Sequence, residues 1–257
     1  MNALFRLTLQ QMLGRKKIWI LLLFLCLPIF LVSAILLAQG FRGVEGENTD
    51  QIAVVVLYVL YPQSLCILAS LLYGATLLAG EIEDKTLVYL FTRAQPRWKV
   101  LLGKYIATVA VLTVLVIASM SLAYALFGAP YGLQVWVALV VPIFGACLAY
   151  TAVFSLLGLL VPRRAIPIGI IYGIVFEVFL SFVPAVINEL TCSYYLRSLG
   201  FNLASDITLP QDVLEVMTMT TAPPGRAIAA ILLIATLTLS VSAWLIHRRE
   251  WPLTEGV

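Results

Sequence analysis

Few residues of this 257-residue chain are of types that could do chemistry, and those few are scattered. The one histidine, His247, ends an apolar run beside two arginines, which indicates a polar cap at a helix end. A single histidine without nearby carboxylates makes no metal site and leaves Ser-His-Asp catalysis without a base. Cys26, Cys66 and Cys147 lie in three separate apolar runs and Cys192 lies alone outside them, so we expect no structural disulfide.

A nucleotide site is also not predicted. A phosphate-binding loop needs the pattern G-x-x-x-x-G-K-[ST], but Trp98 stands where the glycine before Gly103-Lys104 belongs, and Tyr105 follows the lysine. We therefore predict that the chain is not an enzyme and that it binds no cofactor or metal of its own.

Glu177 is an ionisable residue inside an apolar run, and its position needs a physical explanation. It lies about eleven residues into an apolar run that is long enough to span a bilayer. A carboxylate at the bilayer centre costs roughly 2.5–3.5 kcal/mol to insert, so it should face protein or a water-filled cavity. Gly169, Gly173, Ser181 and Ala185 share its four-residue spacing, and small residues let helices pack closely. The four residues Gly169, Gly173, Glu177 and Ser181 therefore belong to a helix interface or to a translocation path.

Membrane spans must position these residues. Hydrophobic residues make up 62% of the chain and charged residues 11%, against about 25% charged in soluble domains. Backbone groups in lipid need partners within their own segment, and no run shows the alternation of a barrel strand, so the spans should be helices. We predict an all-α polytopic membrane protein with one transmembrane domain over residues 1–257. Its six spans are predicted at about 18–38, 52–79, 103–127, 134–161, 166–187 and 227–246.

The N-terminal segment predicts an interfacial helix. Residues 1–17 place Leu4, Leu7 and Met12 on one side, with basic residues elsewhere, which is typical of a helix lying on the inner leaflet. The apolar run that follows is longer than the about 7–15 residues of a signal peptide, and no convincing small-x-small cleavage site follows it. We therefore expect the first span to be retained.

Basic residues predict the orientation. With both termini in the cytosol, 13 Lys and Arg residues are cytosolic and three are outside, which agrees with the positive-inside rule. The net charge of +3 then reflects membrane orientation, and we expect no nucleic-acid partner.

The segment GEIEDKTLVYLFTRAQPRWKVLLGK, residues 80–104, holds eight of the 29 charged residues of the chain. Its acidic start continues the second span, and Pro96 is placed to begin the next helix. Because the apolar stretch TLVYLF lies between them, residues 80–102 are predicted to form a cytosolic helical elbow. A plain solvated loop is the alternative.

Several of these motifs together resemble the permease subunits of type-2 ABC exporters, the ABC-2-type permease family. The matching elements of the elbow are an acidic residue, a Thr-Leu pair, an apolar patch, Pro-Arg and Leu-Gly-Lys, here Glu81 and Glu83, Thr86-Leu87, Leu90-Phe91-Thr92, Pro96-Arg97 and Leu102-Gly103-Lys104. Farther on, YGIVFEVFLSFVP and YYLRSL place Glu177, Pro184, Tyr195 and Arg197 where related members carry similar residues. Lys85, where a glycine is usual, and the order TRAQPR depart from the pattern.

The resemblance implies a division of labour. Two permeases, as copies or paralogues, would pair in the cytoplasmic membrane of a prokaryote, and each would engage a cytosolic ATP-binding-cassette ATPase that binds ATP and Mg. The elbow would couple to this ATPase, and the turn PRRAIP would be a second contact. The ATPase-coupling residues would be Glu81, Glu83, Thr86, Leu87, Leu90, Phe91, Pro96, Arg97, Lys104, Arg163 and Arg164. The outer segment 188–226 would be a short helical or re-entrant cap over the exit.

Two other functions stay open. The chain could be an ATPase-independent secondary transporter that uses Glu177 as a proton or ion carrier. Such carriers commonly show internal repeats, and none is clear between residues 1–127 and 128–257. It could also be a membrane scaffold without transport activity. Neither the substrate nor the choice between homodimer and heterodimer follows from the sequence.

Overall fold

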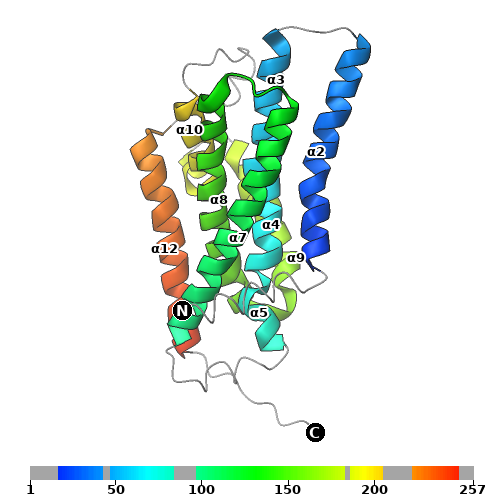
Figure 1. Ribbon diagram of the computed structural model, residues 1–257. Helices are drawn as coiled ribbons and strands as arrows, with labels where there is room; N and C mark the ends of the chain where they lie inside the picture. The colour runs from blue at the N-terminus through cyan, green and yellow to red at the C-terminus, as the bar shows by residue number, and fades with distance from the viewer. Residues whose placement is uncertain (1–16, 43–46, 84–96, 183–185, 205–221, 249–257) are drawn as a thin grey trace.

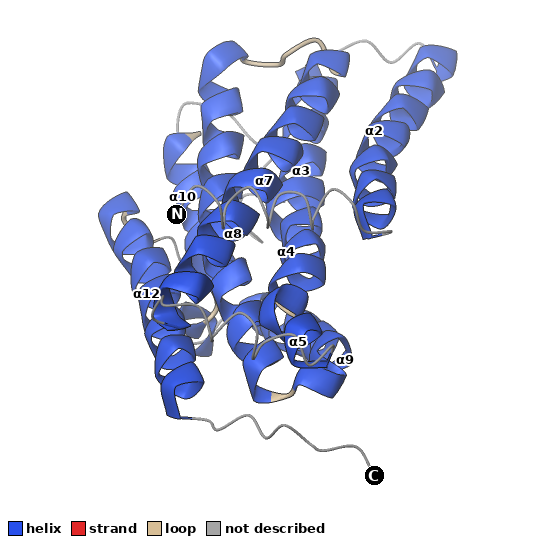
Figure 2. Cartoon of the chain, turned by 60° about the horizontal axis from the view of Figure 1, so that its bottom comes forward, coloured by secondary structure: helices blue, strands red, loops and turns tan. Residues whose placement is uncertain are grey.

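A computed structural model describes residues 17–42, 47–83, 97–182, 186–204 and 222–248, and all regular structure in these ranges is helical. The all-α prediction is therefore confirmed for this part of the chain. Its α-helices are α2 (Lys17–Arg42), α3 (Glu47–Tyr58), α4 (Cys66–Gly74), α5 (Thr76–Glu83), α7 (Arg97–Leu126), α8 (Gly132–Leu160), α9 (Ala165–Tyr172), α10 (Cys192–Leu203) and α12 (Pro224–Arg248). Its π-helical and 3-10 pieces are η1 (Val59–Leu65), η2 (Pro162–Arg164), η3 (Gly173–Phe179), η4 (Leu180–Phe182) and η5 (Val186–Leu190). Figure 2 shows no strand among them.

Five helical stretches are long and apolar enough to cross a membrane, which indicates a polytopic membrane protein. They are Trp19–Leu37, Ala53–Gly80, Trp98–Leu126, Gly132–Leu160 and Pro224–Arg248. These correspond to five of the six predicted spans. The remaining predicted span, at 166–187, is not confirmed. This stretch is not one α-helix but the succession α9, η3 and η4, with η5 beyond it. The predicted interfacial helix and most of the elbow fall on residues 1–16 and 84–96, outside the described residues.

The second span is itself interrupted by π-helix η1, and its sequence explains why. Pro62 has no N–H, so it leaves a carbonyl of the preceding turn without its usual donor. The Ser64 hydroxyl donates to the carbonyl of Val59 at 2.8 Å. The carbonyl that Pro62 leaves without a donor lies four or five residues before it, so the Ser64 bond strengthens this turn without replacing the missing one.

Helix α8 is the centre of the bundle, and α4, α7, α10 and α12 pack around it (Figure 1). In α8, 72% of the membrane-length window is buried, against 22% in α2 and 17% in α12. Gly158 allows one of the closest approaches, since a Cβ at this position would overlap the carbonyl oxygen of Ala75, between α4 and α5. The junction of α4 and α5 is therefore packed backbone to backbone against the last part of α8.

Hydrogen bonds join the outer helices to this centre. The Tyr105 hydroxyl of α7 donates to the carbonyl of Leu148 in α8 at 2.7 Å. The Ser119 hydroxyl of α7 donates to the carbonyl of Leu25 in α2 at 2.9 Å, and the Tyr61 hydroxyl lies 3.0 Å from the Ser119 oxygen. These bonds tie the peripheral helix α2 to the bundle through α7.

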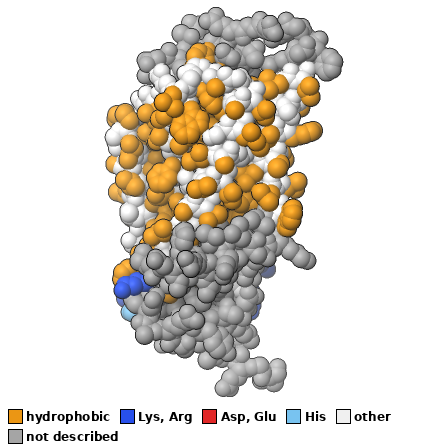
Figure 3. Space-filling view, in the orientation of Figure 1, with side chains coloured by type: hydrophobic (Ala, Val, Ile, Leu, Met, Phe, Trp, Pro, Cys, Tyr) orange, Lys and Arg blue, Asp and Glu red, His pale blue; other side chains and the backbone are white. Residues whose placement is uncertain are grey.

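The exposed surface has the pattern of a membrane belt. Figure 3 shows hydrophobic side chains over the middle of one face, with the visible Lys and Arg side chains below them. Trp19, Trp98 and Trp244 are about half to three-quarters exposed and lie near the start of α2, the start of α7 and the end of α12. In Figure 1 these are the lower ends of the three helices. Tryptophan is enriched at membrane–water interfaces, so this end is expected to lie at one of them.

Helix α10 packs inside the bundle against α8 and α12. Its first residues contact Glu177 of η3, and Arg197, about one turn farther on, contacts Ser181 of η4. The segment 173–182 and α10 therefore run in the same direction, and the chain between them must turn back. The 12 residues of α10 rise about 18 Å at ~1.5 Å per residue, too little to span a bilayer. Helix α10 is thus a short helix inside the bundle, parallel to the segment 173–182.

Candidate functional site

Every fourth residue from Ala165 to Ser181 is buried, and most residues between them are exposed. The buried set is Ala165, Gly169, Gly173, Glu177 and Ser181. On an α-helix of 3.6 residues per turn, a strict four-residue stripe drifts around the axis. The π-helical hydrogen bonds of η3 span five residues instead of four, so this segment winds more residues per turn and offsets the drift. The small-residue stripe thus stays on one face.

The two glycines of the stripe bring this segment against α4. A Cβ on Gly169 would overlap the end of the Leu71 side chain, and one on Gly173 would lie 3.2 Å from Cγ2 of Ile67. Phe154 of α8 lies against the same face, 3.4 Å from the Gly169 Cβ position. The stripe is therefore in contact with protein along its length.

Glu177 is fully buried on this face, and its carboxylate accepts four hydrogen bonds. Oε1 accepts from the Tyr172 hydroxyl at 2.9 Å and from the Cys192 backbone N–H at 3.3 Å. Oε2 accepts from the Tyr150 hydroxyl at 3.0 Å and from the Ser193 backbone N–H at 2.9 Å. Each oxygen thus has one phenol and one backbone donor.

The N-terminus of α10 completes this arrangement. Thr191 is the N-cap residue, and its side-chain oxygen accepts a bond from the Tyr194 N–H at 3.3 Å. The Glu177 carboxylate accepts hydrogen bonds from the N–H groups of Cys192 and Ser193, which lie between Thr191 and Tyr194 at the positive end of the helix dipole. The buried carboxyl group is held here by two hydroxyls and the N-terminus of a helix. In the described ranges, no group of three or more His, Cys, Asp or Glu side chains is arranged to hold a metal ion.

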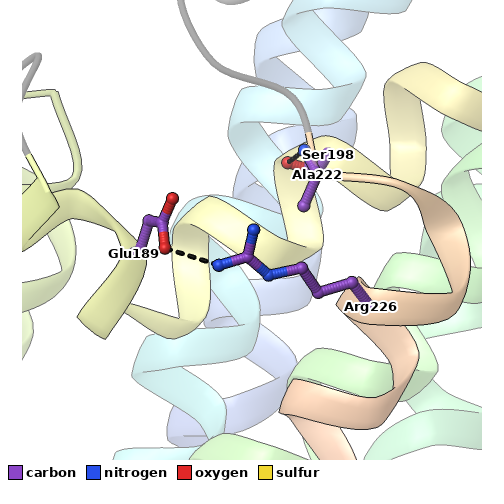
Figure 4. A network of polar contacts seen from close by, with 4 residues as sticks. All are labelled: Glu189, Ser198, Ala222 and Arg226. Carbon is purple, nitrogen blue, oxygen red and sulfur yellow. Dashed lines mark hydrogen bonds and ion pairs between the residues drawn. The ribbon is translucent and has the colours of Figure 1, made fainter.

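Polar contacts also fix the outer part of α10. The buried Arg197 donates to the Ser181 carbonyl at 2.9 Å. Ser198 accepts from the backbone N–H of Ala222 at 3.1 Å, and Asn202 donates to the Ala222 carbonyl at 2.9 Å. Figure 4 shows the Ser198–Ala222 contact and, beside it, the ion pair of Glu189 with Arg226 at 2.6 Å. Helix α10 is therefore attached both to the segment before it and to the start of α12.

The predicted coupling residues are described only in part. Thr86, Leu87, Leu90, Phe91 and Pro96 lie outside the described residues. The remaining ones lie at the end of the bundle where α5 ends and α7 begins. Glu81 and Glu83 are in the last turn of α5, Arg97 and Lys104 are in the first turns of α7, and the exposed Arg163 and Arg164 are in η2. Lys104 is buried there, with 3% of its surface exposed. The turn η2 packs against α5, so the structure brings the start of the elbow and the second predicted contact together.

Sequence reasoning missed the partners of Glu177. Tyr172 precedes it by five residues, a spacing that does not share a face on an α-helix but comes closer on a π-helix. Tyr150 comes from α8, and the two backbone donors depend on where α10 begins. The tyrosine in YGIVFE was visible in the sequence, but the π-helical turn that brings it to the carboxylate was not.

The structure thus combines five helices that are long and apolar enough to cross a membrane with a buried carboxyl group that is hydrogen-bonded to the start of α10. No family model matches the chain, and no curated protein was found to match it.

Proposed function

We propose that this chain is the permease subunit of an ATP-driven exporter of the ABC-2 type. It would form the translocation path together with a second permease, a copy or a paralogue. A separate cytosolic ATPase would bind ATP and Mg and would supply the energy. The chain itself carries no catalytic role in this proposal.

The observation that carries the proposal is the contact between η2 and α5 at one end of the bundle. These two segments are far apart in the sequence, but each leads into a predicted ATPase contact: α5 into the elbow, and η2 into the turn PRRAIP. A docked ATPase could therefore push on both at once. Movement there would reach the centre of the bundle, because α5 is packed against α8 at Gly158.

The same end has the features of a cytosolic membrane surface. The starts of α2 and α7 and the end of α12 are the lower ends of these helices in Figure 1, and they carry Lys17, Arg97, Lys99 and Arg248. Lys99 lies over the Trp98 ring at 5.5 Å and Arg248 over the Trp244 ring at 4.7 Å. Basic residues next to interfacial tryptophans favour a cytosolic position under the positive-inside rule. We therefore place the elbow in the cytosol of a prokaryotic cell and α10 on the outer side.

The proposal also includes a sixth passage through the membrane, formed by the segment predicted as a span at 166–187. The segment 165–182 runs upward beside α4 and exposes Ile171, Ile174, Phe176 and Phe179. In an exporter, this segment and α10 together would form the passage and cap the outer exit.

The contacts of Glu177 support this reading more than the carrier hypothesis. A proton carrier must expose its carboxylate to each side in turn. Glu177 has no exposed surface, and two of its four partners are backbone N–H groups, which cannot accept a proton. We therefore do not assign it the role of a carrier.

The test is a pull-down from the native membrane in mild detergent. Leu87→Asp plus Phe91→Asp places two charges in the apolar stretch of the elbow, so we expect an ABC ATPase to copurify with wild type and to be lost with this variant. The control is Val213→Asp plus Val216→Asp, the same number of charges in the predicted outer segment, which should retain the ATPase. The proposal fails if no ATPase copurifies with wild type, or if both variants lose it equally.

A further inference from the structure

We propose that Glu177 is a fixed anionic anchor that holds helix α10 in the bundle, so that the position of α10 depends on this one carboxylate. The inference goes beyond the proposed export function, because it concerns the docking of α10 and is measured on α10 itself.

The first argument is the complete pairing of the helix start. The first four N–H groups of an α-helix have no partner within the helix. In α10, the Thr191 N–H donates to the Asn188 carbonyl at 3.0 Å, and the Tyr194 N–H donates to the Thr191 side chain. The two between them, of Cys192 and Ser193, both donate to Glu177. Without this carboxylate, two adjacent donors would lose their partner.

The second argument is burial. Cys192 is 2% exposed, Ser193 is 3% exposed and Glu177 is not exposed at all. Water cannot reach these donors while α10 stays in place, and a buried unpaired N–H is costly. Movement of α10 toward water would relieve that cost. Loss of the anchor should therefore favour an undocked α10 over a docked but unpaired one.

The third argument is that the anchor gathers three separate elements at one carboxylate. Tyr150 comes from the central helix α8, and its hydroxyl also lies 3.0 Å from Oγ of Ser193, in α10. Tyr172 comes from α9. Glu177 thus fixes α10 relative to α8 and α9 together. A shift of η3 against α8 would break contacts at both oxygens, so the docking of α10 depends on how the segment 173–179 is wound.

Cys192 is a native reporter for the test. In a background with Cys26→Ala, Cys66→Ala and Cys147→Ala, it is the remaining thiol of the chain. The rate of its reaction with a charged maleimide, measured in nanodiscs, reports the exposure of the start of α10. We expect slow labelling with Glu177 present and an increase of about tenfold or more in Glu177→Gln, because the amide NH2 cannot accept from a backbone N–H. Glu177→Ala should label faster still.

A second measurement separates exposure from thiol chemistry. Burial and the neighbouring Glu177 raise the pKa of the Cys192 thiol, so removal of the charge alone would speed labelling somewhat. Hydrogen exchange of the backbone amides of residues 192–203 does not depend on the thiol. Faster exchange across α10 in Glu177→Gln supports the anchor, and protection equal to that of wild type overturns it.

Two matched variants complete the experiment. Tyr172→Phe removes one phenol donor but leaves both backbone bonds, so labelling should stay within about threefold of the Glu177-containing background. If neither Glu177 variant can be purified folded, Tyr150→Phe plus Tyr172→Phe decides, because it breaks the bonds of the carboxyl group to both α8 and α9 and also removes the contact of the Tyr150 hydroxyl with Ser193 of α10. Faster labelling and faster exchange in this double variant support the proposal. Rates unchanged from the background overturn it.

Discussion

Helix α8 and the segment 165–182 both come from apolar runs that predict a membrane span, but they fold differently. Helix α8 is one 29-residue α-helix at the centre of the bundle, in contact with protein on most of its surface. The segment 165–182 changes from α- to π- to 3-10 helix and buries only about one residue in four. Hydropathy describes both runs as apolar. The two segments differ in how each is held. Helix α8 is held by close backbone packing, and the segment 165–182 is held by the buried Glu177 carboxyl group and its hydrogen-bond donors.

The largest effect on this comparison is expected from Gly158→Ala in α8. The new Cβ would overlap the backbone oxygen of Ala75, which cannot rotate away, so the stability of the solubilised protein should fall by about 3 kcal/mol. Thermal unfolding in detergent measures it. Gly169→Ala is the matched variant in the other segment, where the obstacle is the flexible end of Leu71 and the loss should be about 1 kcal/mol.

Gly225→Ala serves as the control for both substitutions, because nothing lies within 4 Å of its Cβ position. It should leave the melting temperature unchanged. If Gly158→Ala were tolerated as well as Gly225→Ala, close backbone contact would not be what holds α8.

Glu177→Gln should cost about 2 kcal/mol, since it replaces one of the two acceptor oxygens by an NH2 group, which cannot accept from the backbone donors of α10. Thr151→Val in α8 is its counterpart: it loses one bond of 3.3 Å to Ser70 and should cost well under ~1 kcal/mol. Chemical denaturation or thermal unfolding compares the two. Equal losses would mean that the buried charge does not distinguish the two segments.

Thr191→Ala should cost about 1 kcal/mol, the usual loss when an N-cap hydroxyl is removed. Thr191→Ser keeps the hydroxyl and should stay close to wild type. Hydrogen exchange of the backbone amides at the start of α10 would show whether the loss of stability is located there. If Thr191→Ala left this exchange unchanged, the cap would not contribute to holding α10 beside Glu177.

The smallest effect is expected from Glu189→Gln. Its ion pair with Arg226 is partly exposed, with 54% of the Arg226 and 37% of the Glu189 side chain accessible, so its contribution is screened by solvent and should be below about 0.5 kcal/mol. The melting temperature of wild type should approach that of the variant as salt is raised. A loss as large as that from Glu177→Gln would show that this surface ion pair contributes as much to stability as the buried carboxyl group does.

Much of this fold could be predicted from the sequence, because lipid leaves few choices. An apolar run of about 20 residues must satisfy its own backbone, so helices and their approximate bounds follow from composition alone. The four-residue stripe around Glu177 was equally visible. What could not be predicted is the shape of the run at 166–187, because hydropathy reports how apolar a segment is and carries no information on whether its helix is wound with four- or five-residue hydrogen bonds.

The sequence by itself therefore determined that this is a helical membrane protein, where five of its long helices lie, and that Glu177 is an ionisable residue in an apolar run. Only the tertiary structure decided what Glu177 does there. Its partners come from α8, α9 and the first turn of α10, up to 27 residues away in the chain. A hydrogen bond needs donor and acceptor within about 3 Å, and only packing of these segments against one another brings them that close.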